Sequence, residues 1–406
     1  MFALHETTRS ALCRMGFLVL CVLPICAILA AAGWLRSDVC RAIHERELSG
    51  QLGLAVSCDR VLLTHPEGLR YEGIVLADPE TGAEIASASW LNVSKHDDAM
   101  FVGLGAAELN GSRIDCLRDL LMRQLRTGKP GKRVLAVSPK LTMRMLDKSQ
   151  FVLEDVSAQF DFARDKAQVV VDFQPVDRQG RKKVELGVMR NRRTTPPSTT
   201  IAVDTKSSTL PCSLVSAFFP VLARLGPASR FQGGMLMFES PQGWNGHFEG
   251  KFVNVDLASL VTHQYSRQLT GTAQIRIQAA KISAGRIEQM RGELTSGAGV
   301  IHQEFVKSMT NRFNLSTSRV KSTLGESHPF SELAFAFAMD AMGLLIKGKC
   351  QSATPGAVLV DQKGVAIGEP TPAIRLPLAI VEEAFSSSRA ALISVLPIAD
   401  DGRKRR

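Results

Sequence analysis

A charge-free segment of 21 residues, Met15–Leu35, constrains this chain more than any other feature of its sequence. A helix needs about 20 apolar residues to cross the roughly 30 Å hydrocarbon core of a bilayer. We therefore expect a single-pass anchor over 15–35 in the inner (cytoplasmic) membrane, with 1–14 in the cytoplasm and the bulk of the chain in the periplasm. Arg9 and Arg14 precede the segment on the expected cytoplasmic side. The predicted anchor residues are Phe17, Leu20, Leu23, Ile28 and Trp34.

A cleaved signal peptide is the alternative for this segment. Ala30 and Ala32 form an A-x-A-like cleavage site after the apolar stretch. The stretch is longer than the roughly 7–15 residues of a signal-peptide core, which favours an uncleaved anchor. Both interpretations place the residues after Arg36 outside the cytoplasm.

The composition limits the classes of structure and of partner that are possible for the exported part. Apolar residues make up 45% of the 406 and charged residues 22%, which allows a sizeable core and excludes a globally disordered chain. The formal net charge of +10 fits contact with anionic lipid headgroups. Two basic runs, Arg123–Arg133 and Arg178–Arg193, either make such contacts or keep solvated strand edges from pairing with other strands. Export and the lack of aromatic residues among the arginines argue against nucleic acid.

The cysteines of the exported part are Cys40, Cys58, Cys116, Cys212 and Cys350. They are scattered singly and in odd number, so we expect isolated buried thiols, although a Cys58–Cys116 bridge is conceivable. No Cys/His group has the spacing of metal ligands, and we predict neither a metal nor a cofactor.

Period-two alternation dominates the rest of the sequence. In Thr272–Ala279, apolar and polar residues alternate, which predicts a strand with one buried face. Leu333–Met339 predicts a second strand, and turns at 78–82 and 164–166 predict two hairpins. We therefore expect a mainly β fold with short helices (α+β), built on a long antiparallel sheet.

Short helices are predicted at four places, one of them the stripe Phe305, Met309 and Phe313, whose members are four residues apart. Ser37 and Asp38 are candidate caps for a helix through Arg46, and Asp256 is a candidate N-cap for a helix holding Leu257, Leu260 and Val261. A third helix, interrupted at Pro220, is expected after Pro211. The Thr/Pro/Arg-rich stretch 191–211 is the best candidate for a linker or exposed loop. It would separate a β-rich region 36–190 from a second one at 212–386, which a basic tail, 387–406, follows.

Several of these segments resemble AsmA-like envelope proteins. The resemblance rests on Leu48–Gly82, whose hairpin reads GIVLADPETG, and on strand and turn segments between Trp244 and Val381 such as LTGTAQIRIQAAKISAGRIEQMRGELTSGAGVI and HPFSELAFAFAMDAMGLLIKGKC. It covers about 48–91 and 244–381. It implies a sheet whose apolar face forms a groove for lipid, as in bridge-like lipid-transfer proteins. This chain is shorter than the longest members, so we do not expect its sheet to span a periplasm.

The resemblance implies a non-enzymatic envelope protein that binds or transports lipid or takes part in outer-membrane biogenesis. Its lipid-facing residues would be Ile275, Ile277, Phe335 and Phe337. A structural or protein-interaction envelope protein with closed β domains and no lipid groove would show the same alternation, and this alternative stays open. No residue is predicted to be catalytic, because His96-Asp97-Asp98 is more typical of a solvated turn.

Overall fold

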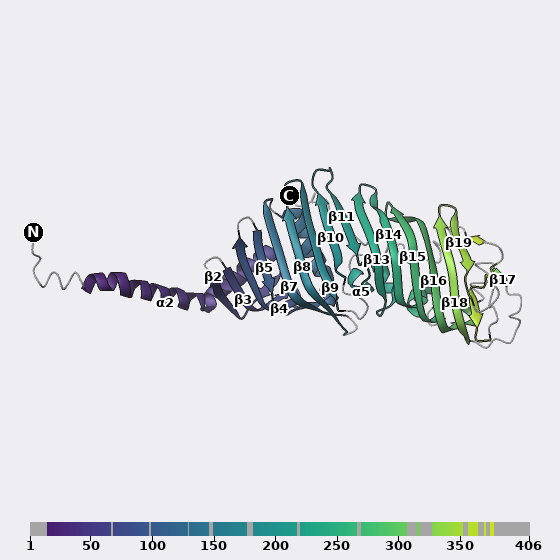
Figure 1. Ribbon diagram of the computed structural model, residues 1–406, viewed down its shortest axis with the longest axis horizontal. Coiled ribbons are helices and arrows are strands. Elements are labelled where there is room, and N and C mark those ends of the chain that lie inside the picture. Colours follow the sequence, from purple (N-terminus) through teal and green to yellow (C-terminus); the bar gives the residue numbers. More distant parts are fainter. Residues whose placement is uncertain are drawn as a thin grey trace, which may run out of the picture.

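The computed structural model describes residues 14–65, 68–96, 99–128, 130–145, 149–176, 182–216, 220–265, 269–306, 315–316, 327–351, 356–363, 369–370 and 374–376. Its central feature is a 20-stranded sheet that extends away from a helical N-terminus (Figure 1). The predicted mainly β architecture with an apolar N-terminal helix is confirmed.

The helical segments are η1 (Leu18–Val22), α2 (Leu23–Leu35), α3 (Asp38–Leu52), η2 (Gly111–Arg113), α4 (Ile114–Thr127), α5 (Cys212–Val215), η3 (Pro220–Leu225) and α6 (Leu257–Tyr265). The strands of the first half are β1 (Ala55–Ser57), β2 (Arg60–His65), β3 (Gly68–Ala77), β4 (Glu84–His96), β5 (Ala99–Leu104), β6 (Ala107–Asn110), β7 (Lys132–Arg144), β8 (Gln150–Phe162), β9 (Lys166–Pro175) and β10 (Val184–Asn191). Those of the second half are β11 (Ser198–Asp204), β12 (Leu210–Pro211), β13 (Arg230–Ser240), β14 (Gly243–Asp256), β15 (Leu269–Ser283), β16 (Arg286–His302), β17 (Leu315–Ser316), β18 (Ser327–Asp340), β19 (Gly343–Gly348), β20 (Leu359–Asp361), β21 (Glu369–Pro370) and β22 (Ile374–Leu376).

The N-terminal helix Arg14–Trp34 is 21 residues long and no part of it is buried in the protein. Its length and apolar composition suffice to cross a membrane. The π-helical segment η1 ends two residues before Pro24. Proline has no N–H and its ring clashes with the carbonyl four residues earlier, which accounts for the local change of helical pitch.

Helix α3 begins as predicted, because the Ser37 side chain accepts a hydrogen bond from the N–H of Cys40. The helix runs past Arg46 to Leu52, since Leu48 and Leu52 pack against Val56 and its neighbours on the sheet. It ends at Gly53, whose φ of 68° is the left-handed conformation that glycine adopts most readily.

The sheet runs without interruption from β2 to β22. Most neighbours are antiparallel hairpin partners, including the predicted pairs β3–β4 and β8–β9. In the stretch 191–211, where a linker or exposed loop was expected, the structure has the turn of the β10–β11 hairpin and then β11. Because β11 pairs with both β10 and β13, the two proposed halves share one sheet.

Helix α4 makes a crossover between two strands of the sheet. It connects β6 to β7, which lie parallel to each other, and parallel strands require a long connection. This helix was not expected from the sequence, although Ile114, Leu117, Leu121 and Leu125 recur at helical spacing. Leu121 and Leu125 pack on the sheet beside Val169 and Val188.

The apolar cores lie on one side of the sheet, which we call the helix side because α3, α4, η3 and α6 pack there. The predicted cap of α6 is confirmed, since the Asp256 carboxylate accepts hydrogen bonds from the N–H groups of Ala258 and Ser259. The opposite side of the sheet carries mostly polar side chains, and we call it the open side.

Candidate functional site

An unbroken line of apolar side chains crosses the helix side of the sheet. The strand registers align one such residue from each successive strand, and we call this line the apolar row. From β2 to β11 its members are Leu63, Leu69, Val93, Val102, Ala136, Ala158, Val171, Leu186 and Val203. From β13 to β19 they are Met235, Phe248, Ala280, Met290, Met339 and Leu344.

Most members of the apolar row are neither buried nor fully exposed. Leu63 at one end is 55% exposed, whereas Val203 and Ala280 are buried. The remaining members are half-buried. In a fully packed hydrophobic core, large apolar side chains are rarely exposed to water on so many successive strands. The row is thus a surface that an apolar ligand could cover.

The predicted lipid-facing residues lie beside the apolar row on the same side of the sheet. Ile275 is in register with Leu294 and Phe335, and Ile277 with Gly292 and Phe337. The structure therefore brings all four predicted residues into two adjacent lines. Ile277 is buried in the core, while Ile275, Phe335 and Phe337 are half-buried and pack against it.

An aromatic cluster borders the apolar row in the second half of the sheet. Phe231, Phe248 and Phe252 have ring centroids 5.3–5.6 Å apart. Phe231 and Phe252 are buried, whereas Phe248, the member in the row, is half-buried. Sequence reasoning did not single out these residues, although the period-two pattern of β13 and β14 contains them.

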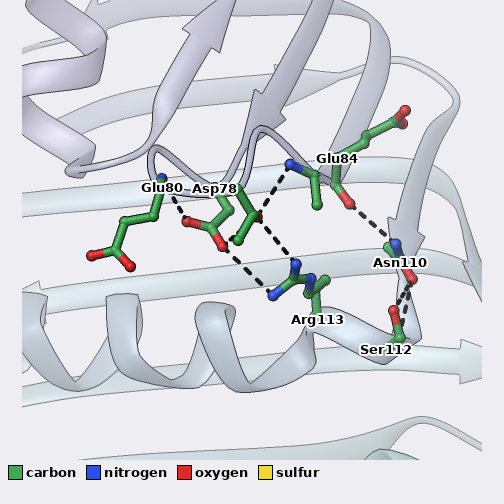
Figure 2. Close-up of polar contacts among 8 residues, drawn as sticks. Asp78, Glu80, Glu84, Asn110, Ser112 and Arg113 are labelled. Atoms are coloured by element: carbon green, nitrogen blue, oxygen red, sulfur yellow. Dashed lines mark hydrogen bonds and ion pairs between the residues drawn. The ribbon is translucent and has the colours of Figure 1, made fainter.

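Helix α4 crosses the helix side of the sheet over strands β4 to β10. Its start is tied to the β3–β4 turn by Arg113, whose guanidinium contacts Asp78 (3.5 Å) and donates a hydrogen bond to the Thr81 hydroxyl (3.1 Å) (Figure 2). Hydrogen bonds from Thr81 and from the N–H of Glu80 lower the pKa of Asp78, which therefore stays ionised. Asn110 adds a second tie by donating to the Glu84 carbonyl (Figure 2).

The open side of the sheet has a concavity of about 710 Å³ above Gly187, Ala202 and Gly234. Small residues at these positions leave the backbone uncovered. Carboxylates border it: Glu185 stands directly opposite both Asp172 and Asp204, and Glu249 continues the line on β14. Like charges directly across a sheet repel one another, so this line costs stability.

The described cysteines are all unpaired, and a Cys58–Cys116 bridge is not formed. Cys40, Cys58, Cys212 and Cys350 are buried as isolated thiols, as expected. Burial raises the pKa of Cys58, Cys212 and Cys350 to about 11 each. These thiols are therefore protonated at neutral pH and are poor nucleophiles.

The polar candidates of the sequence do not assemble into a reactive cluster in the part of the chain that the structure describes. His96 is exposed at the end of β4 with its ring beside Phe101. Asp97 and Asp98 lie outside the described residues. Among the described side chains, no group of three or more His, Cys, Asp or Glu is placed to hold a metal ion.

The chain matches no protein-family model, no curated protein and no solved structure.

Proposed function

We propose that this protein is a membrane-anchored envelope protein that binds acyl lipid along the apolar row and thereby takes part in lipid transport or outer-membrane biogenesis. The observation that carries the proposal is the continuity of mostly half-buried apolar side chains from β2 to β19. An extended hydrocarbon chain needs such a line, whereas a closed core needs buried side chains.

The energetics suit a hydrocarbon ligand. Each CH₂ group that leaves water contributes about 0.8 kcal/mol. An acyl chain that buries about ten of them gains roughly 8 kcal/mol, which is comparable to the ~4–15 kcal/mol cost of association. Contact with further row residues on neighbouring strands would add to this gain.

The position of the row relative to the apolar helix supports loading from a membrane. The row begins at Leu63 on β2, and β2 is in contact with α2. The most exposed member of the row thus lies on the strand that touches the proposed anchor. An inner-membrane anchor with a periplasmic sheet, and the resemblance of 48–91 and 244–381 to AsmA-like proteins, agree with lipid uptake at this end.

The proposed function involves no chemical turnover. Lipid is held by its hydrocarbon and released unchanged, so the side chains of the row have only to exclude water. The buried thiols at Cys58, Cys212 and Cys350 are protonated and take no part.

Mass spectrometry of co-purified lipid tests the proposal. The chain from Ser37 onward, exported and purified without detergent, should carry phospholipid or another acyl lipid in stoichiometric amount. Met339→Asp places a charge in the row and should reduce bound lipid at least fivefold. Ala338→Asp is the matched control, because this neighbour faces the open side opposite Arg291 and should leave bound lipid unchanged. Circular dichroism establishes that both variants are folded.

Protein binding on the open side is the second candidate function. Leu236 and Phe238 of β13 are 44% and 42% exposed on that side, which favours a contact surface. A folded, monodisperse and lipid-free preparation of the chain from Ser37 onward would contradict the lipid proposal and favour this one.

A further inference from the structure

Three arginines from the two basic runs of the sequence meet at one end of helix α4. Arg126 lies in the last turn of α4, and Arg190 and Arg192 lie at and just beyond the end of β10. They belong to the runs Arg123–Arg133 and Arg178–Arg193, which sequence alone does not connect. The packing of Leu125 against Val188 brings the two runs together on the helix side of the sheet.

Arg192 is fixed by the backbone of α4. Its Nη2 donates hydrogen bonds to the carbonyls of Leu125 (2.9 Å) and Gly128 (3.2 Å) at the end of that helix. The backbone N–H of Arg192 also donates to the carbonyl of Asp165 (2.8 Å). The guanidinium carries five N–H donors, and these two side-chain bonds come from a single nitrogen.

Arg190 is largely buried, with 17% of its side chain exposed. It donates to the Thr199 hydroxyl (3.0 Å) and lies 3.9 Å from the Glu239 carboxylate. Burial lowers the pKa of the Arg190 guanidinium, Glu239 opposes this effect, and Arg126 and Arg192 lower the pKa further. An arginine stays protonated despite such a shift, so the positive charges persist and repel one another.

The charge of this cluster is not balanced by the described acidic side chains that pair with it. Among them, Glu239 is the partner of Arg190, and Asp165 pairs with the exposed Arg193. Among the described ion pairs, Arg190 is the one member of the three that has a carboxylate partner. A bound anion would relieve this repulsion, and arginine is the residue best suited to hold the oxygens of a phosphate.

The cluster lies on the same side of the sheet as the apolar row. Arg190 is four residues along β10 from the row member Leu186, or about 13 Å at ~3.3 Å per residue. Trp244, in register with Glu239 of β13, lies four residues along β14 from the row member Phe248 and is half-buried. Tryptophan favours positions where one edge meets hydrocarbon and the other meets polar groups.

We propose that Arg126, Arg190 and Arg192 form a binding site for the phosphate of an anionic phospholipid whose acyl chains lie on the apolar row. The inference rests on the proposed lipid-binding function and adds to it the class of headgroup. The site selects between headgroups by their charge. A headgroup with net negative charge neutralises the three arginines, whereas a zwitterionic headgroup places its own cationic group next to them.

Calorimetric titration of the full chain in micelles of an uncharged detergent tests the site. Short-chain (dihexanoyl) phosphatidylglycerol should bind at least tenfold more tightly than dihexanoyl phosphatidylcholine. Arg126→Gln, at an exposed position, should weaken phosphatidylglycerol binding at least tenfold. Arg133→Gln is the matched control: it belongs to the same basic run, is exposed and pairs with Asp161 away from the cluster, so binding should change less than twofold.

Binding of inorganic phosphate measures the contribution of the headgroup phosphate without that of the acyl chains. Inorganic phosphate should compete with phosphatidylglycerol but bind at least tenfold more weakly, because it lacks acyl chains. Equal binding of the two lipids, or equal loss in R126Q and R133Q, would overturn the inference and leave lipid binding itself intact. If inorganic phosphate binds as tightly as phosphatidylglycerol and R126Q loses this binding, the ligand of the site is free phosphate and not a lipid headgroup. This outcome would overturn the inference and count against the proposed function.

Discussion

The ring of Phe337 on β18 lies over Gly292 of the neighbouring strand β16. The two residues are in register, and a Cβ at position 292 would stand 2.6 Å from Cζ of Phe337 and 2.6 Å from the carbonyl oxygen of Arg276. A side chain at 292 would collide with the ring, so glycine allows this close approach.

Gly292→Ala should destabilise the protein by about 1–3 kcal/mol, because the added methyl group overpacks this contact. Urea unfolding of the full chain in uncharged detergent measures the effect. Gly297→Ala is the matched control in the same strand, where a Cβ meets nothing within 4 Å, and it should be nearly neutral. Equal effects of the two substitutions would show that the contact with Phe337 does not matter.

Arg192→Ala should destabilise the protein by about 1.5–3 kcal/mol. The substitution leaves the carbonyls of Leu125 and Gly128 without their charged donor at the end of α4. The adjacent Arg193→Ala removes an ion pair with Asp165 from a largely exposed side chain and should cost less than about 1 kcal/mol. Thermal unfolding monitored by circular dichroism compares the loss of stability in the two variants. A larger loss in Arg193→Ala would contradict the capping role assigned to Arg192.

Glu185→Lys should stabilise the protein by about 0.2–1 kcal/mol for each cross-strand pair it converts from repulsive to attractive. The carboxylate of Glu185 stands between Asp172 and Asp204, so two pairs change sign. Unfolding in urea at low salt and at about 1 M salt provides the check, since the Debye length falls to ~3 Å there. The gain should shrink at high salt, and a salt-independent gain would point to packing instead of charge.

Stability should fall in mildly acidic solution because of His328. Burial lowers the pKa of His328 below its ordinary value of 6.5, and nearby His302 lowers it further. The unfolded chain therefore binds a proton before the folded protein does, and stability is lost as the pH falls below about 6.5. Nε2 of His328 is buried without a hydrogen-bond partner in the described structure, which agrees with a neutral ring.

Urea unfolding at pH 7.5, 6.5 and 5.5 measures this dependence. His328→Phe keeps a ring at the site and removes the titrating group, so its stability should vary less over this range than that of the wild type. Parallel pH profiles for the two proteins would show that His328 does not contribute.

Local patterns predicted a large part of the fold. The N-caps at Ser37 and Asp256 and the turns at 78–82 and 164–166 depend on residues within a few positions of one another, and the structure confirms them. Helix α4 was missed because its basic residues were considered without their apolar spacing. The stretch 191–211 looked like a linker from its Thr, Pro and Arg content, yet β11 forms there because both β10 and β13 supply backbone partners.

The sequence by itself determined which residues of each strand share a side, and that an apolar helix precedes the sheet. Side chains alternate along a strand with a period of two, so this information is local. Only the tertiary structure decided which residues of different strands stand next to one another, because register depends on turns, on bulges such as the one between Phe248 and Gly250, and on the crossover through α4. For this reason the apolar row, and the meeting of Arg126 with Arg190 and Arg192, emerge only when the strands are paired.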